Sequence, residues 1–326
     1  MRVLVTGGSG YVGSHTVREL DASGHEVVIY DNLSTGFRSL STGFELIEGD
    51  IADKQKVSQS LDGIDAVIHF AGSAYVGESV SDPRKYFRNN VESGLKLLDA
   101  VLASSVRVFI FSSTCATYGV PRELPITEKC PQEPVNPYGA SKLFFEHALS
   151  AYATSHGLRY AILRYFNAAG AHASGEIGEL HDPETHLIPL ALKAALGTKP
   201  ALTVFGKDLE TPDGTCVRDF IHVSDLGSAH VKALDHLTGD GDSIRLNLGT
   251  GKGASILQLL ATIKKVIGKE VPYHFADARA GDPPILYADP TKARKILGWS
   301  AQVDLEEIIT TAWAWEQKLA ASQAWR

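Results

Sequence analysis

The sequence predicts an α/β fold, a doubly wound parallel sheet followed by a smaller domain of mixed structure. Short apolar runs rich in Val, Ile and Phe alternate with helix-length segments through the first half of the chain. Such alternation is typical of strand–helix–strand units in a parallel sheet. It stops after about Ala169, and 326 residues are enough for two unequal domains. We therefore expect a first domain over residues 1–169 and a second over 170–326.

The first half contains six predicted strands, each short, apolar and suited to burial on both faces. They are RVLVT (2–6), EVVIYD (26–31), FELIEGD (44–50), DAVIHFAG (65–72), VRVFIFSS (106–113) and RYAILRYFN (159–167). The segments between them predict helices over Tyr11–Ser23, Pro83–Ser104 and Pro137–His156.

The second half begins with a polar, aperiodic stretch over 169–186, which predicts a loop able to close over a ligand. Helices then mix with the short predicted strands ALTVFG (201–206), RDFIHV (218–223) and IRLNLG (244–249). We assign this half to the smaller domain, with a segment near 217–237 that returns to the first domain.

Three evenly spaced glycines, Gly7, Gly10 and Gly13, follow the first strand and open the first helix. In a dinucleotide-binding turn the first glycine allows the tight bend, the second lets the backbone approach the pyrophosphate, and the third lets helix pack on strand. The helix N-terminus then offers its N–H groups to the phosphates. Three glycines alone could be turn punctuation. The strand before them and the helix after them favour a dinucleotide site of the Rossmann type.

Two acidic residues end the next predicted strands. Asp31 lies 18 residues after Gly13, near the usual ~20 for an acid that binds the ribose hydroxyls. A carboxylate there repels a 2′-phosphate, which favours NAD over NADP, and Arg38 is the one nearby residue that could weaken this preference. Asp50 could meet the adenine ring, or it could cap a helix.

The segment NPYGASK places Tyr138 and Lys142 four residues apart on one helix face. We expect the ammonium and an oxidised nicotinamide to lower the pKa of the phenol, which would make it a base. A surface pair on a helix is the alternative. Thr114, at the carboxyl end of a predicted strand, could share a substrate proton with Tyr138. Its neighbours Ser112 and Ser113 could simply cap or turn the chain.

Composition excludes several classes of function. The net charge is −7, and Lys and Arg are scattered, which argues against a nucleic-acid groove. The chain lacks the roughly 18 continuous apolar residues of a membrane helix, and its first strand leaves no room for a secretory leader. Its three cysteines, Cys115, Cys130 and Cys216, are widely spaced. They fit neither a disulfide framework nor a metal site, and we expect a cytoplasmic protein.

With these motifs in order, the chain resembles the extended short-chain dehydrogenase/reductases and, within them, the UDP-glucose 4-epimerase (UDP-galactose 4-epimerase) family. The likeness covers nearly the full length. It rests on VTGGSGYVGSHT, DNLSTG, HFAG, VGESV, NNV, NPYGASK, LRYFNAAGAH, DGTCVRDFIHVSDL and TAWAWE.

The resemblance implies NAD as cofactor and a UDP-sugar as substrate, with Tyr138 as catalytic base and Thr114 and Lys142 as its partners. The implied NAD contacts are Gly7, Gly10, Tyr11, Val12, Gly13, Asp31, Asn32, Asp50, Ile51, Phe70, Ala71, Gly72, Asn89, Tyr138, Lys142 and Phe166. The implied UDP-sugar contacts are Thr114, Tyr138, Asn167, His186, Leu187, Phe205, Arg218, Arg279 and Asp282.

The implied reaction interconverts UDP-galactose and UDP-glucose through a 4-keto sugar, with transient hydride transfer to tightly bound NAD. A homodimer is implied as well, paired through the helices that contain Asn89 and Tyr138. The position of Leu286 helps decide in the family whether an N-acetyl group fits. Leu is intermediate in size, so we expect UDP-glucose and UDP-galactose as substrates and weak activity on N-acetylated sugars. The alternative is another UDP-sugar as substrate, either an N-acetylated hexose or a pentose.

The chain departs from the family pattern at two places. Thr114 stands where many members have Ser, and Ser73-Ala74-Tyr75 stands where some members carry a Lys that contacts the cofactor. Two other functions were weighed. A dehydratase is expected to have Asp-Glu after the Thr, where this chain has Cys115-Ala116, and an NAD-sensing regulator would be expected to lose the Tyr or the Lys.

The sequence predicts no metal site. His172, His181 and His186 are loosely grouped, and we find no carboxylate at ligand spacing beside them. Near the C-terminus, Trp313, Trp315 and Trp325 are interpreted as packing or interface residues.

Overall fold

The structure, a computed structural model, describes residues 1–278 and 283–321. The main-sheet part contains β1 (Arg2–Thr6), α1 (Tyr11–Ala22), β2 (Glu26–Asp31), η1 (Arg38–Ser41), β3 (Glu45–Glu48), α2 (Lys54–Ser60), β4 (Ala66–His69), α3 (Val76–Ser81), α4 (Pro83–Tyr86), η2 (Phe87–Ser93), α5 (Gly94–Leu102), β5 (Val108–Thr114), η3 (Cys115–Tyr118), α6 (Pro137–His156), β6 (Arg159–Tyr165), α8 (Val223–Thr238), β11 (Ile244–Leu248) and α10 (Thr291–Leu297). The other elements are β7 (Asn167–Ala169), α7 (Leu187–Leu196), β8 (Leu202–Phe205), β9 (Val217–Arg218), β10 (Phe220–His222), β12 (Ala254–Ser255), α9 (Ile256–Ile267), β13 (Tyr273–Ala276), β14 (Ile285–Leu286) and α11 (Leu305–Ala321).

Seven strands form the main sheet in the order β3-β2-β1-β4-β5-β6-β11. Every neighbouring pair in it is parallel. The strand order reverses between β1 and β4, and at such a switch point the carboxyl ends of the strands leave a crevice for a ligand. The predicted doubly wound parallel sheet of the Rossmann type is therefore confirmed.

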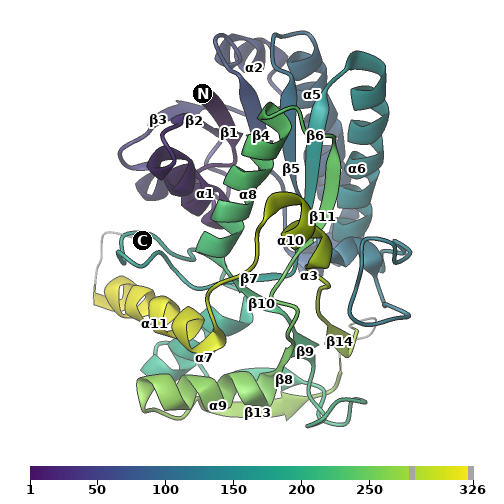
Figure 1. The fold of residues 1–326 in the computed structure, drawn as a ribbon. Helices are drawn as coiled ribbons and strands as arrows, with labels where there is room; N and C mark the ends of the chain where they lie inside the picture. Colours follow the sequence, from purple (N-terminus) through teal and green to yellow (C-terminus); the bar gives the residue numbers. More distant parts are fainter. Residues whose placement is uncertain (279–282, 322–326) are drawn as a thin grey trace.

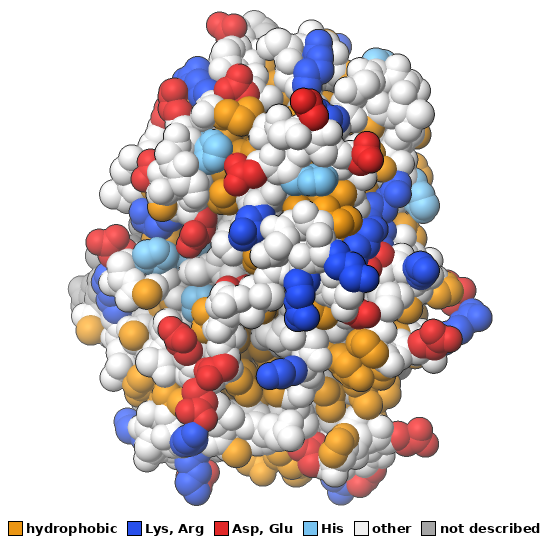
Figure 2. Space-filling view, in the orientation of Figure 1, with side chains coloured by type: hydrophobic (Ala, Val, Ile, Leu, Met, Phe, Trp, Pro, Cys, Tyr) orange, Lys and Arg blue, Asp and Glu red, His pale blue; other side chains and the backbone are white. Residues whose placement is uncertain are grey.

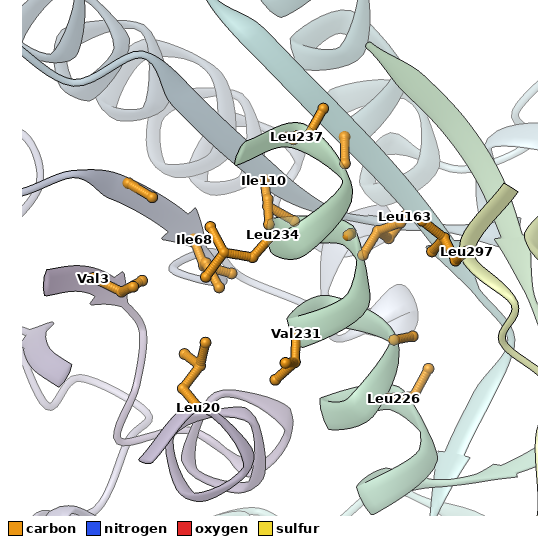
Figure 3. Packing of buried hydrophobic residues seen from close by; sticks show 14 of the residues in the cluster. Val3, Leu20, Ile68, Ile110, Leu163, Leu226, Val231, Leu234, Leu237 and Leu297 are labelled. Carbon is orange, nitrogen blue, oxygen red and sulfur yellow. The ribbon is translucent and has the colours of Figure 1, made fainter. Parts of the chain in front are cut away.

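Helices cover both faces of the sheet, because alternate strand residues point to opposite sides. Val3 and Val5 of β1 belong to a core with α1 and α8, whereas Leu4 belongs to a core with α2, α5 and α6. Helix α8 runs across the front of the strands in Figure 1. Its Leu234 lies among Ile68 and Ile110 of the sheet in Figure 3.

The smaller part of the molecule lies at the carboxyl ends of the strands (Figure 1). It contains short sheets, of which β12-β9-β14 is mixed, since β12 pairs antiparallel and β14 parallel with β9. Helices α7, α9 and α11 share a third core with β8. The expected smaller mixed domain is confirmed.

Two sequence-based assignments need correction. The run IRLNLG was placed with the smaller domain, yet β11 is the edge strand of the main sheet and pairs with β6, because its alternate residues are buried against α8 and α10. The helix predicted over 83–104 is divided into α4, the π-helical η2 and α5. A widened π turn of this kind often marks a functional site.

On the face in Figure 2, acidic and basic side chains are interspersed, as the scattered charges in the sequence predicted. Among the helices of the described residues, none has the length and apolar character needed to cross a bilayer. Cys115, Cys130 and Cys216 form no disulfide with one another. Trp315 is buried and donates to the Glu179 carbonyl over 2.7 Å, Trp313 packs in the third core, and Trp325 lies outside the described residues.

Candidate functional site

The turn after β1 has no room for side chains at its glycines. A Cβ on Gly7, whose φ is +74°, would lie 2.5 Å from the Ala71 nitrogen, and a Cβ on Gly13 would lie 2.2 Å from the Gly7 carbonyl oxygen. Real Cβ atoms do not approach so closely. The glycines therefore bring the start of α1, the end of β1 and the segment after β4 into direct backbone contact.

The N-terminus of α1 fits an anionic group. Gly10 is its N-cap without a side-chain cap, and the first turn holds no acidic residue. Val12 and the buried Tyr11 stand in that turn. Uncapped N–H groups and the positive end of the helix dipole together favour a phosphate. The turn thus fits the pyrophosphate of a dinucleotide.

The predicted ribose and adenine residues gather at the ends of β2 and β3. The Asp31 carboxylate accepts hydrogen bonds from the Ser9 and Leu33 nitrogens, at 2.9 and 2.8 Å, and burial raises its pKa. A carboxylate has about four acceptor positions, and the Ser9 hydroxyl also bonds this one, so it retains capacity for a further hydroxyl such as that of a ribose. Arg38 is paired with Glu48 on the surface.

Asn32 donates to Asp50 over 3.0 Å, which joins the two predicted adenine-side residues, and Ile51 is buried beside them. The helix-capping interpretation of Asp50 is wrong for α2, because Asp53 is the N-cap of that helix and accepts from the Lys56 nitrogen.

The segment after β4 is held in place from two sides. The Phe70 and Ala71 nitrogens donate to the Thr6 carbonyl at 2.8 and 3.0 Å. Asn89 donates to the Ser73 hydroxyl over 3.0 Å. The sequence analysis missed Asn90, which is buried, accepts from the Ser73 nitrogen at 2.8 Å and donates to the Ser141 hydroxyl on α6 at 3.0 Å. The sequence shows two adjacent asparagines, and no pattern in it distinguishes their positions in the fold.

Helix α6 carries the predicted catalytic pair. Asn136 is its N-cap and accepts from the Gly139 nitrogen over 2.8 Å, and Pro137 fills the first turn. Lys142 is buried, and its Nζ donates to the Ser112 carbonyl over 2.9 Å. A Cβ on Gly72 would lie 3.6 Å from that Nζ. The interpretation of a surface pair is therefore wrong, because the lysine points inward, to Ser112 and to Gly72 in the segment after β4.

Thr114, at the carboxyl end of β5, hydrogen-bonds the Tyr138 phenol. Burial raises the pKa of Tyr138 well above its ordinary value, the nearby Tyr165 phenol raises it further, and the Thr114 hydrogen bond opposes them. Burial thus outweighs the Thr114 hydrogen bond and acts against the predicted lowering of the Tyr138 pKa. The Lys142 ammonium donates its hydrogen bond to the Ser112 carbonyl instead. Burial also lowers the pKa of Lys142 to about 8, against the attraction of Glu146.

The two serines before Thr114 do more than cap or turn the chain. Ser112 Oγ lies 2.5 Å from the Tyr165 hydroxyl, and Ser113 donates to Glu146, which is paired with Arg164 inside the protein. Tyr165 was missed, although it stands in the quoted LRYFN run. It stands opposite Thr114 in the β5–β6 pairing, and its phenol acts electrostatically on Tyr138.

On the substrate side, Arg218 acts electrostatically on Cys115, the residue after Thr114. Leu286 of β14 pairs with Arg218 of β9, and it packs against a small core that contains the buried Phe166. The structure therefore brings Arg218, Phe166 and Leu286 to the neighbourhood of Thr114. Asn167 opens β7 and is exposed. Phe205 ends β8 and is half-buried.

Four other predicted substrate contacts lie at the start of α7 or outside the described residues. His186 is the N-cap of α7 and its ring contacts Glu179, and Leu187 is the first residue of that helix. Arg279 and Asp282 lie outside the described residues. Asp219 was missed by the sequence analysis. It is buried and accepts from the nitrogens of Thr250, Gly251 and Ala288, so it joins the chain beside Arg218 to the segment after Leu286.

Known proteins match this chain over most of its length. Residues 3–249 match the NAD dependent epimerase/dehydratase family. The UDP-glucose 4-epimerase of Rhizobium meliloti (strain 1021) is 49% identical over 318 residues, 97% of each chain. The crystal structure of UDP-glucose 4-epimerase from Brucella ovis in complex with NAD has a TM-score of 0.94 and 53% identity, and covers 96% of this chain and 97% of that one.

The structure of UDP-glucose 4-epimerase from Bifidobacterium longum in complex with NAD+ and UDP has a TM-score of 0.93 and 39% identity, with 98% of each chain covered. The agreement therefore extends from the dinucleotide turn through the smaller domain. The chain belongs to the NAD dependent epimerase/dehydratase family and, within it, to the UDP-glucose 4-epimerases.

Proposed function

We propose that this protein is a UDP-glucose 4-epimerase, an isomerase that interconverts UDP-galactose and UDP-glucose with a tightly retained NAD. The observation that supports this best is the hydrogen bond between Thr114 and the half-buried Tyr138, with Lys142 directed toward Gly72 of the dinucleotide site. A phenol and an ammonium beside a dinucleotide site suit a reaction in which proton transfer is coupled to hydride transfer.

The residues that hold NAD are proposed to be those brought to the crevice at the switch point. The pyrophosphate would bind at the N-terminus of α1, the adenosine end at Asp31, Asn32, Asp50 and Ile51, and the nicotinamide end between Gly72 and Phe166. Gly7, Gly10, Tyr11, Val12, Gly13, Phe70, Ala71, Asn89, Tyr138 and Lys142 complete this set. NAD, when bound, takes up the hydride of the sugar C4 and returns it.

Tyr138 is proposed to take the proton of the sugar 4-hydroxyl and later to return it. Its phenol is neutral at neutral pH in this buried setting, so it needs a positive charge nearby to act as a base. Thr114 shares the proton through its hydroxyl. Lys142, fixed at the Ser112 carbonyl, contributes its charge and orients the nicotinamide end of the crevice.

The UDP end is proposed to be held firmly and the hexose loosely. Arg218 offers a forked, permanently charged donor to the diphosphate. Thr114, Asn167, His186, Leu187, Phe205, Arg279 and Asp282 are the other proposed substrate contacts. A sugar held mainly through its UDP can present either face of C4 to the cofactor. That freedom is what epimerisation requires of the binding site.

Leu286 is proposed to set the substrate range, because it pairs with Arg218 beside the sugar position. A side chain of this size leaves less room than Ala or Ser for an N-acetyl group. We expect UDP-N-acetylgalactosamine to be converted weakly, and Leu286→Ser to raise its conversion relative to UDP-galactose in a competition assay. Efficient conversion by the unaltered protein would show that an N-acetylated hexose is a true substrate.

Two other functions are less well supported. A dehydratase is expected to carry acidic groups beside Thr114, where η3 begins with Cys115-Ala116. Burial raises the pKa of the Cys115 thiol to about 12, so that side chain cannot replace a carboxylate. A regulator that only binds NAD would not need Tyr138, Thr114 and Lys142 at one site.

The decisive test is proton NMR of UDP-galactose with the purified protein and no added NAD. Formation of UDP-glucose up to a fixed ratio establishes the epimerase and shows that the cofactor is carried by the protein. Unchanged UDP-galactose, with NAD present in the denatured protein, would retain the cofactor site and move the search to another nucleotide sugar.

We propose a homodimer in the cytoplasm. Val80, Phe87 and Phe144 leave 65%, 41% and 53% of their surfaces exposed on α3, η2 and α6, and these helices pack on one another. A patch of this kind favours a protein partner, and light scattering on Phe144→Glu should report a shift from dimer to monomer. We further propose that residues 1–169 with 217–237 and β11 form the NAD-binding domain, and the rest of 170–326 the UDP-sugar-binding domain.

A further inference from the structure

The loop between β7 and α7 gathers four side chains that the proposed reaction does not use together. Glu179, His181, Glu184 and His186 each offer one ligand atom, and these atoms all lie within 4.8 Å of one another. The sequence analysis found no carboxylate at ligand spacing beside these histidines, and that statement is wrong. Both glutamates stand within two or three residues of a histidine, and the loop folds back so that they meet.

Two distances in the cluster suit a tetrahedral cation better than a hydrogen bond. His181 Nδ1 lies 3.4 Å from Glu179 Oε1 and 3.5 Å from Glu184 Oε1. Both exceed the roughly 2.7–3.2 Å of a good hydrogen bond. They equal the edge of a tetrahedron around Zn²⁺, about 3.3–3.5 Å for metal–ligand bonds of about 2.0–2.2 Å. His186 contacts Glu179 directly, and its half-exposed ring can turn to open that edge.

Two buried atoms in the cluster have unused bonding capacity. Within the part of the chain that the structure describes, His181 Nδ1 and Glu184 Oε2 are buried and form no hydrogen bond. Only 4% of the Glu184 side chain is exposed. Its Oε1 accepts from the Thr185 and His186 nitrogens at 2.8 and 2.9 Å, which fixes the carboxylate toward the loop. A ring nitrogen facing two carboxylates must carry either a proton or a metal ion.

The cluster and its neighbours carry more negative than positive charge when the histidines are neutral. Lys193 lies 3.6 Å from Glu184 and 3.5 Å from Glu316, whereas Glu179 has the two histidines beside it. With neutral histidines, one ammonium therefore stands against the charges of three carboxylates. A divalent cation would balance the excess of two negative charges.

We propose that Glu179, His181, Glu184 and His186 form a binding site for one divalent transition-metal ion, with Zn²⁺ as the preferred ion. Two imidazoles and two carboxylates are a ligand set that zinc accepts, and four protein ligands leave no open position for substrate. The site is therefore structural, and in the metal-bound protein His186 serves the metal, so that Leu187 and the other proposed contacts hold the substrate without it. It fastens the loop at the start of α7, where His181 packs edge-on against the rings of Tyr11 and Tyr75.

The test measures metal binding to the full-length protein without reference to turnover. The protein is stripped with a chelator and titrated with Zn²⁺ against a coloured zinc indicator, and separately with Co²⁺ alone. We expect one Zn²⁺ per chain, a higher melting temperature with Zn²⁺, and the intense visible absorption of tetrahedral Co²⁺. A folded, stripped protein that takes up no stoichiometric zinc, or gives the weak spectrum of octahedral Co²⁺, would overturn the proposal.

Two substitutions locate the site. His181→Ala and Glu184→Gln should each weaken zinc binding by more than the roughly 10- to 100-fold that outer-shell changes cost. His172→Ala is the matched control, because this histidine stands in the same loop, bonds to Ser174 over 2.8 Å and is not in the cluster. Full zinc affinity in both cluster variants would place the metal elsewhere and overturn the assignment. If either variant fails to fold, the Co²⁺ spectrum of the unaltered protein still decides.

Discussion

The dinucleotide turn and the loop between β7 and α7 meet at Tyr11, whose hydroxyl donates to the Gly170 carbonyl over 2.6 Å. They are built in opposite ways. The turn is made of backbone, and its glycines exclude side chains, whereas the loop is organised by buried charges such as Glu179 and His181. A backbone-built site leaves a fixed glycine spacing in the sequence. A side-chain-built site leaves only scattered polar residues whose meeting depends on how an irregular loop folds.

The largest effect is expected from a substitution that spares the turn and removes the chemistry. Tyr138→Phe should reduce turnover roughly 100- to 10,000-fold, the usual contribution of a general base. The NAD content of the purified protein should remain at one per chain, because the turn binds the phosphates through backbone groups. Turnover is measured by NMR and NAD after denaturation. Undiminished turnover would exclude Tyr138 as the base, and loss of NAD would show that the turn does not act independently.

A methyl group in the turn tests whether its backbone contacts are as tight as the structure has them. Gly13→Ala places a Cβ at 2.2 Å from the Gly7 oxygen. We expect a loss of about 1–3 kcal/mol in the free energy of unfolding, as overpacking usually costs, and a fall in bound NAD. Chemical denaturation and NAD assay measure both.

Gly77→Ala is the control for that experiment, because a Cβ there meets nothing within 4 Å. Because Gly77 lies in helix α3, the substitution should leave the free energy of unfolding unchanged or raise it by up to about 1 kcal/mol. Equal losses in the two variants would mean that close packing at Gly13 is not what the turn depends on.

The same contrast explains what the sequence could predict. The parallel sheet, the glycine turn and the approach of Thr114 to Tyr138 follow from patterns along the chain, since the carboxyl ends of parallel strands meet at one edge. Asn90, Tyr165 and Asp219 could not be predicted, because their partners are 17 to 69 residues away in the chain. Nor could the direction of the Tyr138 pKa shift, which burial decides. The β11 strand was misplaced for the same reason, since its partner β6 lies far earlier in the chain.

The histidines of the two regions differ in the sign of their pKa shift. His69, at the end of β4, is buried among Phe109, Phe111 and Phe145, and burial lowers its pKa to about 3. His181 in the loop shifts in the other direction because carboxylates face it.

The pKa of a histidine in an unfolded chain is about 6.5, so at acid pH His69 binds a proton in the unfolded chain but not in the folded protein. The stability that neutral His69 contributes is therefore lost as pH falls below about 6.5. Between about pH 7.5 and pH 5.5 we expect a loss of about 1.4 kcal/mol from this group. His69→Asn should remove that part of the pH dependence in urea denaturation. An unchanged slope in the variant would mean that His69 accepts its proton in the folded protein.

The smallest effect is expected at the hydrogen bond that joins the two regions. Tyr11→Phe keeps the ring on His15 and His181 and leaves the Gly170 carbonyl without its donor, which should cost about 1 kcal/mol. Tyr273→Phe, at an exposed tyrosine of β13, is the matched control and should be silent in the same urea titration. If the two regions stand independently, the cost in Tyr11→Phe is confined to stability and bound NAD is unchanged. A parallel loss of NAD would mean that the loop holds the turn in shape, and that the backbone-built site depends on the side-chain-built one.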